Sequence, residues 1–466
     1  MPTPPLAFDL GLRCAQALLC CSEPEAALAQ LQALQPLLQR DRQRACWLQV
    51  QAQVLVEQQQ SEQGLDCAQQ ALVLAGRVGD TATALLAAQR AAMALMRLDR
   101  LPEALALMAA EPPGLPQLPA EQRLYWLCDR ALLFEHANLR TQSLAAYDRV
   151  IAEAEAQQRW LPAADACSNK AVALMYLGQL TASNTQVERS MALSRRAGVD
   201  GVGLLIDEMN LAGNWRDLGW FDRYLARAAS LPAELHAAGL AVWAVNCEHD
   251  LAVAYAWLGR IDLTQRLLAP LDAATPEVMC AARLITRLRL ARDFDARQLA
   301  PRPLALLDEI QVLLDRGGNR SGLLRQALAM ERAVRAAPAE GAALLALIEA
   351  EALAQENLLA ATSAARLRIG LLLSAGDGAA AAVAAQALLD RLAVHGPPPG
   401  TYAPALWWTA SRALASQTPE RAAQLVQLAA DWIDQAASRV PPLYRSSFLQ
   451  RNPINQAVLQ AAAPLR

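Results

Sequence analysis

The chain has 466 residues, of which 54% are hydrophobic and only 5% aromatic. Lys and Arg number 42 against 45 Asp and Glu, which gives a formal net charge of −3. Because no basic stripe is visible, we expect no direct nucleic-acid binding. Alanine and leucine dominate and both favour helix, so the composition predicts an all-α chain.

Nine cysteines are scattered along the chain without a C-x-x-C pair, which argues against a disulfide framework and against a zinc site. The N-terminus MPTPPLAFDLG has no basic segment before an apolar core, so it is not a secretory signal. No apolar run reaches the roughly 18–20 residues that span a bilayer. We therefore expect a cytoplasmic protein with no membrane contact.

Six segments repeat with a period of about forty residues between residues 50 and 259. Their first residues are Val50, Arg90, Asp129, Asn169, Asn210 and Asp250. The third residue of every segment is alanine, and the sixth is large and apolar. A small residue lets two helices touch closely, and a bulky one fills the gap a turn later. Self-similarity at a fixed period predicts stacked helical hairpins.

Turn-forming residues separate amphipathic stretches of helical period along the whole chain. In chain order they lie at 22–24, 60–62, 99–100, 138–139, 178–179, 219–220, 259–260, 300–301, 338–339, 376–378 and 418–419. This spacing predicts about eleven hairpins. A small residue follows most of the earlier turns by five positions: Gly64, Ala104, Ser143, Ser183 and Thr264, with Tyr224 as the exception.

The clarity of the repeat suggests four regions. Residues 1–44 form an N-terminal helical cap or first hairpin, and 45–275 hold the well-registered repeats. Residues 276–439 hold degenerate repeats, and 440–466 form a C-terminal capping tail. In that tail, Tyr444, Phe448 and Leu449 are expected to cover the open apolar end of the last repeat. Asn452 and Pro453 then have the types expected of a helix cap and a first helical residue.

The unit SNKAVALMYLGQLTAS (168–183) resembles the tetratricopeptide repeat, whose usual period is 34 residues. The longer period here is similar to the long-helix variant in the C-terminal sensor part of large bacterial transcriptional activators and signalling ATPases. The tail VPPLYRSSFLQRNPINQAVLQAA (440–462) also resembles the ending of such regions. The resemblance implies a right-handed superhelical solenoid with a C-terminal cap.

In tetratricopeptide geometry, the first helix of each unit lines a concave face that binds peptides and other ligands. The first residue of each segment and the residue one turn earlier should share that face. The polar members of these columns are Asp129, Asp165, Asn169, Asn210, Asn246 and Asp250. Because they include almost no cation, they favour an extended backbone or a cationic ligand over a carboxylate clamp. The alternative is a solvated inner face without a ligand.

Two aromatic residues lie beside turns, where they could be partly exposed as partner contacts. They are Trp220 and Trp257, and packing between repeats is the alternative interpretation. No G-x-x-x-x-G-K-[ST], G-x-S-x-G or H-E-x-x-H motif occurs. We therefore expect no catalytic residues, no metal, no cofactor and no enzyme activity.

Three hypotheses for function follow. The first is a non-catalytic scaffold or sensor that binds a protein, a peptide or a small-molecule effector in its groove, in bacterial signalling or transcriptional regulation. The second is the detached regulatory part of an ATP-dependent transcriptional regulator whose switch domain lies elsewhere. The third is a structural assembly protein. The sequence leaves the ligand, the output module and the oligomeric state open.

Overall fold

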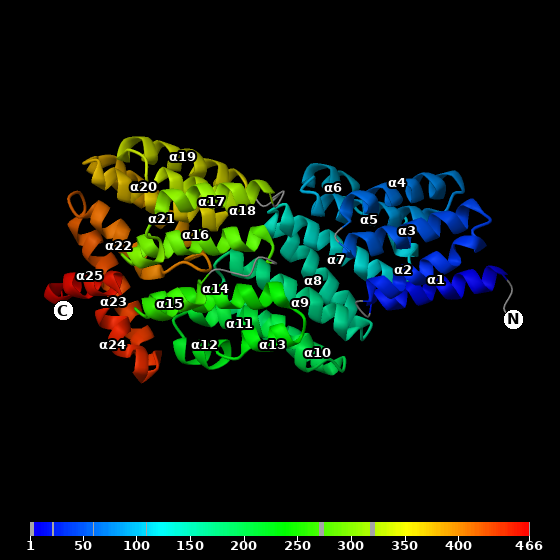
Figure 1. Ribbon diagram of the computed structural model, residues 1–466, viewed down its shortest axis with the longest axis horizontal. Coiled ribbons are helices and arrows are strands. Elements are labelled where there is room, and N and C mark those ends of the chain that lie inside the picture. The colour runs from blue at the N-terminus through cyan, green and yellow to red at the C-terminus, as the bar shows by residue number, and fades with distance from the viewer. Residues whose placement is uncertain are drawn as a thin grey trace. The chain divides into compact units, whose positions relative to one another are not determined.

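The computed structural model describes residues 4–20, 23–58, 60–108, 110–269, 275–316 and 322–465. These residues form α-helices and short 3-10 turns, with no strand among them. The chain divides into two compact units, Met1–Asn169 and Lys170–Arg466. Figure 1 shows the helices of both units, which are described separately.

Unit 1 is built from antiparallel helix pairs. Its helices are α1 (Pro4–Cys20), α2 (Pro24–Leu34), α3 (Asp41–Glu57), α4 (Ser61–Arg77), α5 (Thr81–Arg97), α6 (Leu101–Met108), α7 (Ala120–His136), α8 (Arg140–Ala156) and α9 (Trp160–Tyr176), the last of which runs into unit 2. Two 3-10 turns, η1 (Gln35–Leu37) and η2 (Leu115–Gln117), lie between hairpins.

Unit 2 continues the same pattern of helix pairs. Its helices are α10 (Leu180–Arg196), α11 (Leu205–Asp217), α12 (Phe221–Ala228), α13 (Leu231–Ala237), α14 (Ala241–Trp257), α15 (Ile261–Leu267), α16 (Glu277–Asp293), α17 (Pro303–Arg316), α18 (Gly322–Ala333), α19 (Pro338–Ala354), α20 (Leu358–Ser374), α21 (Gly378–His395), α22 (Ala403–Leu414), α23 (Pro419–Arg439), α24 (Pro442–Gln450) and α25 (Pro453–Ala462). The 3-10 turns are η3 (Gly201–Leu204), η4 (Arg297–Leu299) and η5 (Ala463–Leu465).

The forty-residue period has a simple origin in helix length. Between α3 and α10, every helix except α6 contains 17 residues: α3, α4, α5, α7, α8, α9 and α10. Three residues join α7 to α8, at 137–139, and the same number joins α8 to α9. Two helices and two connections therefore make up one period.

The described helices pair into eleven hairpins at the eleven predicted turns, from α1/α2 to α22/α23. In the sixth hairpin the second helix is broken into α12 and α13, because Pro232, the second residue of α13, cannot continue a helix. Counting along the chain, α16/α17 is the eighth hairpin, α18/α19 the ninth and α20/α21 the tenth. The chain is an all-α solenoid of tetratricopeptide-like hairpins, as predicted.

Several of the first helices end at a residue with left-handed backbone. The backbone angle φ is 58° at Asp99 and at Asn138, 73° at Gly178 and 70° at Gly259. A residue in this conformation ends a helix and satisfies its last carbonyl groups. Glycine and asparagine adopt it at little cost, which explains the turn residues in the sequence pattern.

The repeated alanines form the closest contacts between helices. None of them is more than 2% exposed: Ala52, Ala92, Ala131, Ala171, Ala212 and Ala252. In the bulky column, Leu55 and Phe134 are buried, whereas Trp215 and Tyr255 are partly buried against the same core. Both predicted columns therefore pack as expected.

The small residue in the second helix of a hairpin bonds directly to the alanine column. Ser183 Oγ donates to the carbonyl oxygen of Ala171 at 2.8 Å, and Thr264 Oγ1 donates to that of Ala252 at 3.0 Å. At Gly64 in the second hairpin, an added Cβ would lie only 3.1 Å from the backbone oxygen of Ala52. The two helices therefore cross too closely for a large side chain.

The C-terminal tail packs back against the middle of unit 2 as well as against the last hairpin. Ser447 Oγ donates to the backbone oxygen of Leu258 at 2.7 Å, and Asn452 Nδ2 donates to that of Trp257 at 2.8 Å. Figure 1 shows α23 and α24 beside α12 and α15. The tail thus joins the sixth and seventh hairpins to the eleventh.

The predicted helix start in the tail is confirmed. The Asn452 side chain accepts hydrogen bonds from the backbone N–H groups of Ile454 and Asn455, and Pro453 is the first residue of α25. The ring of Phe448 lies 5.8 Å from that of Phe221, on α12. This contact lies outside the last repeat, which the sequence pattern predicts as the partner of the tail.

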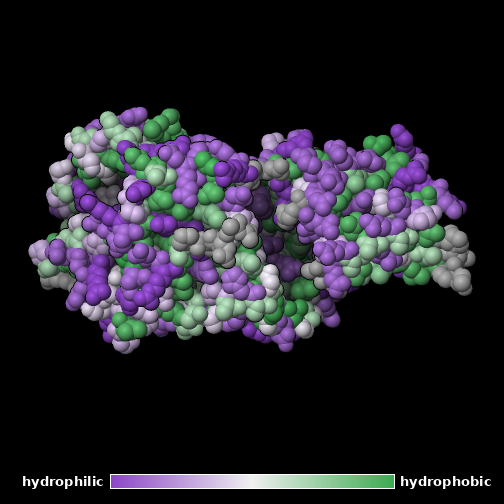
Figure 2. Space-filling view, viewed as in Figure 1, coloured by the Kyte–Doolittle hydropathy of each residue, from purple (hydrophilic) through white to green (hydrophobic). Residues whose placement is uncertain are grey.

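The length and hydropathy of the described helices decide whether they could cross a membrane, and hydropathy also describes their surface. None of them is both long and apolar enough to cross a membrane. On the face seen in Figure 2, hydrophilic and hydrophobic residues are interspersed over each unit.

Candidate functional site

The predicted groove residues of unit 1 lie on the first helices of the fourth and fifth hairpins. Asp129 accepts a hydrogen bond from Gln89 Nε2 at 2.6 Å and lies 3.5 Å from Arg90 Nη1. Burial raises the pKa of the Asp129 carboxyl, and the charge of Arg90 partly opposes the shift. On α9, Asp165 is exposed and Asn169 is half-buried.

The remaining predicted groove residues belong to unit 2, on α11 and α14. Asn210 is half-buried, and Asn246 is exposed one turn before Asp250. Asp250 Oδ1 lies 2.5 Å from Arg216 Nη1, and Arg216 Nε donates to Asp217 Oδ1 at 2.8 Å. The expectation of a face without cations is therefore wrong at Asp250, because Arg216 supplies the charge.

This ion-pair network has a structural role. Asp217 Oδ2 accepts a hydrogen bond from the backbone N–H of Gly400 at 2.7 Å. The network of Arg216, Asp217 and Asp250 therefore ties α11 and α14 to the connection between α21 and α22. Asp250 is engaged in holding unit 2 together, as well as being half-buried on the predicted face.

Of the two aromatic residues, Trp257 is not exposed. Only 2% of it is accessible, because the ring packs 5.0 Å from that of Tyr402 and 5.4 Å from the guanidinium carbon of Arg216. Trp220 is half-buried, with the guanidinium of Arg439 4.9 Å from its ring centre. Packing, the alternative interpretation, therefore accounts for Trp257.

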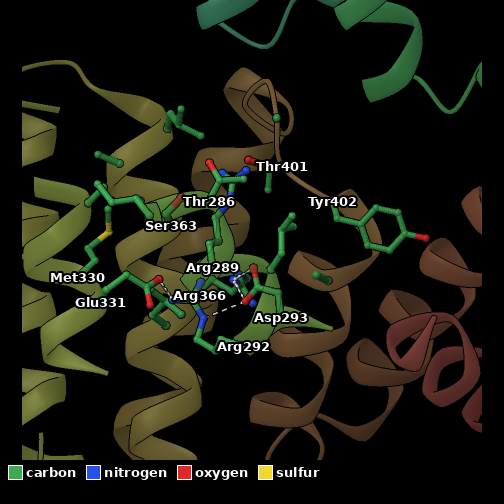
Figure 3. Close-up of a pocket in the computed structure, with 18 of the residues that line it drawn as sticks. Thr286, Arg289, Arg292, Asp293, Met330, Glu331, Ser363, Arg366, Thr401 and Tyr402 are labelled. Atoms are coloured by element: carbon green, nitrogen blue, oxygen red, sulfur yellow. Dashed lines mark hydrogen bonds and ion pairs between the residues drawn. The ribbon is translucent and has the colours of Figure 1, made fainter. Parts of the chain in front are cut away.

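A cavity of about 290 Å³ lies inside unit 2. Its walls come from α16, α18 and α20, the first helices of three consecutive hairpins, and from residues 400–402. Trp257 and Ile454 of α25 also line it. Figure 3 shows the side chains that project into it from these elements.

The cavity lies on the face that the repeat pattern predicts for ligand binding. In the aligned segments, the first-column residue precedes the left-handed turn residue by nine positions, as Asp250 precedes Gly259. The same count from Asp295 and Gly376, which also have positive φ, gives Thr286 and Leu367. Both line the cavity, as do the residues one turn earlier, Ala282 and Ser363.

Ion pairs join the walls of the cavity to one another. Asp293 on α16 lies 2.9 Å from Arg292 Nε and 2.8 Å from Arg366 Nη2 of α20. Glu331 on α18 pairs with Arg292 and, at 2.7 Å, with Arg335 Nη1. Burial disfavours the Asp293 carboxylate, but the charges of Arg292 and Arg366 outweigh it and hold its pKa well below its usual range.

Arg289 differs from the other charged groups of the cavity. Within the described parts of the chain, no residue forms a hydrogen bond or an ion pair with its guanidinium. Burial lowers the pKa of Arg289, and the charge of Asp293 acts in the opposite direction. With Arg292 and Arg366 against Asp293 and Glu331, this extra guanidinium gives the cavity wall a net charge of about +1.

The rest of the lining is apolar with a few hydroxyl groups. Ile285, Leu324 and Met330 contribute aliphatic surface. Figure 3 shows Thr286, Ser363 and Thr401 gathered on one side of the view and the charged groups on the other. An apolar lining with a few converging polar groups is the usual composition of a small-molecule site.

Sequence analysis missed this cavity because its repeats are degenerate. The alanine column stops being recognisable after residue 275, so the groove column was not extended into α16, α18 and α20. A usable signal was nevertheless present: Arg292 and Glu331 are 39 residues apart, one period, with opposite charges. Among the described residues, no cluster of His, Cys, Asp or Glu could hold a metal ion.

No family model matches the chain, and no curated protein matches it. Similar solved structures include a Rap protein complexed with competence and sporulation factor, with 12% identity and a TM-score of 0.43 over 91% of this chain and 100% of that one. The Cut9–Hcn1 structure has 11% identity and a TM-score of 0.35 over 96% and 95%. The human IFIT1 dimer with m7Gppp-AAAA has 13% and 0.35 over 90% of each chain.

Proposed function

We propose that this protein is a non-catalytic scaffold or sensor, and that unit 2 binds a ligand or a short partner segment in the cavity between α16, α18 and α20. The observation that carries the proposal is the continuation of the groove column into this cavity. Thr286 and Leu367, with Ala282 and Ser363 one turn earlier, take the helix positions that face the groove in tetratricopeptide geometry.

A sensor also needs a route by which binding changes the rest of the molecule, and the cavity wall offers one. Tyr402 lines the cavity, and its hydroxyl is 2.5 Å from Asn455 Oδ1 on α25. Ile454, the neighbouring residue, lines the cavity as well. A ligand therefore contacts residues that hold the C-terminal tail, so binding energy can stabilise or displace the tail.

The wider role that we propose is regulation in bacterial signalling or transcription, as a partner of an output module carried elsewhere. The support is the resemblance of the repeats and of the tail 440–462 to the sensor part of transcriptional activators and signalling ATPases. Asn210 and Asn246 in unit 2, and separately Asn169 in unit 1, remain proposed contact residues for a protein or peptide; Asn246 is exposed and the other two are half-buried.

The test is to fill the cavity without altering the core. Ser363→Phe places a large ring in the cavity, since Ser363 lines it and is only half-buried. Intact protein and variant are purified from the native host and compared by native mass spectrometry for bound small molecules and by affinity capture for partners. We expect the bound species to be present with the intact protein and lost with Ser363→Phe.

The matched control is Ala379→Phe, which adds a similar ring at an exposed position on α21. It should retain whatever the intact protein binds, and circular dichroism should show equal helix content for all three. If the same species accompany both variants, the cavity is not the binding site. Loss with an Asn210→Ala, Asn246→Ala double variant instead would move the site to these residues of α11 and α14 in unit 2.

A further inference from the structure

The charge of the cavity restricts what it can hold. The Arg289 side chain is half-buried in the cavity wall, and a guanidinium that is partly removed from water is more stable when it is paired. The two carboxylates nearest to Arg289 along the wall are already engaged: Asp293 by Arg292 and Arg366, and Glu331 by Arg292 and Arg335. The Arg289 guanidinium is therefore available to an anion from outside the chain.

We infer that the cavity takes a small carboxylic acid with a single negative charge, with its carboxylate on the Arg289 guanidinium and its apolar body against Ile285, Leu324 and Met330. This inference rests on the proposed function, since it names the ligand class of the same cavity. The planar fork of arginine matches a carboxylate with two parallel hydrogen bonds.

The number of charges favours a carboxylate over a phosphate. The wall has a surplus of one positive charge, which one carboxylate neutralises. A phosphate monoester carries about −1.5 to −2 charges at neutral pH. The excess would face Asp293 and Glu331 across a confined space, where like charges repel strongly.

The size of the cavity favours a free small molecule over a peptide terminus. Its volume of about 290 Å³ is near the lower end of the range for small-molecule sites. Residues 400–402 and Ile454 of the tail line it together with the three hairpins. The Ser363 hydroxyl can donate to a carboxylate oxygen, whereas the Thr286 hydroxyl already donates to the backbone oxygen of Ala282 at 2.9 Å.

The test is calorimetric titration of the whole chain with straight-chain alkanoates. Hexanoate, octanoate and decanoate are the probes, and octan-1-ol and octylamine are the neutral and cationic counterparts of octanoate. We expect the acids to bind with an optimum length. The alcohol should bind about tenfold more weakly or worse, because it loses the charge-assisted hydrogen bonds, and the amine should not bind.

The variant that isolates the charge is Arg289→Gln, with Arg297→Gln as its matched control because the Arg297 side chain is 94% exposed. Arg289→Gln should weaken octanoate binding about tenfold or more and leave octan-1-ol unaffected. Arg297→Gln should change neither. Arg289→Lys keeps the positive charge but not the planar guanidinium. Its affinity for octanoate should therefore lie between those of the intact protein and Arg289→Gln. It also gives a second measurement if Arg289→Gln is unstable.

Several outcomes would overturn the inference. Equal affinity for acid and alcohol would remove the role of Arg289, and inorganic phosphate binding more tightly than octanoate would make this a phosphate site. A peptide with a free C-terminal leucine that binds more tightly than octanoate, with no binding of its amide, would make it a peptide-terminus site. If Ser363→Phe abolishes binding of a native ligand but no alkanoate binds, only the ligand class is wrong. If Ser363→Phe changes neither, the proposed function fails too.

Discussion

His249 on α14 shows how a buried side chain is fixed by its charge state. Its Nε2 lies 3.1 Å from Arg283 Nε, which donates to it, so the ring must be neutral. Burial, with the charge of Arg283, lowers the pKa of His249 to about 4 from its ordinary value of 6.5. Asp250 acts in the opposite direction, and the charge of Arg289 adds to the lowering.

A pH dependence of stability follows from this shift. Because the pKa is lower in the folded state, unfolding takes up a proton between pH 6.5 and 4, and stability is lost as the pH falls through that window. The loss attributable to His249 is roughly 2–3 kcal/mol. His249→Gln keeps an acceptor for Arg283 without the titration. Urea unfolding at pH 7 and pH 4.5 should therefore show a smaller difference for the variant, whereas equal differences would contradict the assignment.

Individual residues were predictable from sequence where the repeat is regular. The alanine column, the turn residues and the Asn452 cap lie in positions that the backbone geometry dictates locally. The charged groups of the cavity were not predictable. Arg292, Asp293 and Arg366 meet only because three degenerate hairpins stack, and Arg289 stands out only once the partners of its neighbours are known.

At the scale of helices, the length of the helices determines the forty-residue period, and the short distance at which paired helices cross determines where small residues are needed. The count of eleven hairpins followed from turn chemistry alone, even where the columns had decayed. The irregular places reflect other constraints. Pro232 divides the second helix of the sixth hairpin, and the long connection between α16 and α17 contains η4. The tail was predicted as a cap, but its contacts with α12 and α14 depend on how the hairpins curve, which sequence does not show.

Gly259 and Gly376 both lie in left-handed turns, and comparing Gly→Ala at the two positions distinguishes the cost of backbone strain from the cost of a steric clash. Gly259 has φ of 70°, and an added Cβ would overlap the backbone oxygen of Ser447 in the tail. Gly376 has φ of 79° with nothing within 4 Å of such a Cβ. Gly376→Ala should cost about 1–2 kcal/mol through strain alone. Gly259→Ala should cost more and should release the tail.

Hydrogen exchange measured by mass spectrometry distinguishes the two effects. In Gly259→Ala, amides of α24 and α25 should exchange faster than in the intact protein, because the tail is displaced from the end of α14. In Gly376→Ala, those amides should be unchanged, and any increase should be confined to α20 and α21. Tail protection that is equal in both variants would show that the Ser447 contact does not hold the tail.

Within unit 2 taken as a whole, the tail is the element that connects distant hairpins. Asn452 is fully buried and has two roles: its Oδ1 caps α25, and its Nδ2 donates to the backbone oxygen of Trp257. Tyr402 lies beside it in the same core, with its ring 5.4 Å from that of Trp432. The cavity and the tail therefore share one apolar core.

Replacing Asn452 should lower the stability of unit 2 through two separate losses, the cap of α25 and the hydrogen bond to Trp257. Asn452→Ala loses the cap and leaves the Trp257 carbonyl unpaired, which together should cost about 2–4 kcal/mol. Asn452→Ser keeps a capping oxygen but is too short to reach Trp257, so it should cost less. Thermal unfolding measures both, with the exposed Asn246→Ala as the control. Equal losses for the alanine and serine variants would mean that the cap contributes nothing.

The return of the tail to Trp257 and Leu258 has a consequence for how this chain can evolve. An open solenoid can gain or lose a repeat with little penalty, since each unit contacts only its neighbours. Here four hairpins, from α16 to α23, lie between α14 and the tail that binds it. Duplication or deletion of one of these hairpins would shift the tail, so that it could no longer reach Trp257 and Leu258. The contact between the tail and the end of α14 thus constrains the number of hairpins that can lie between them.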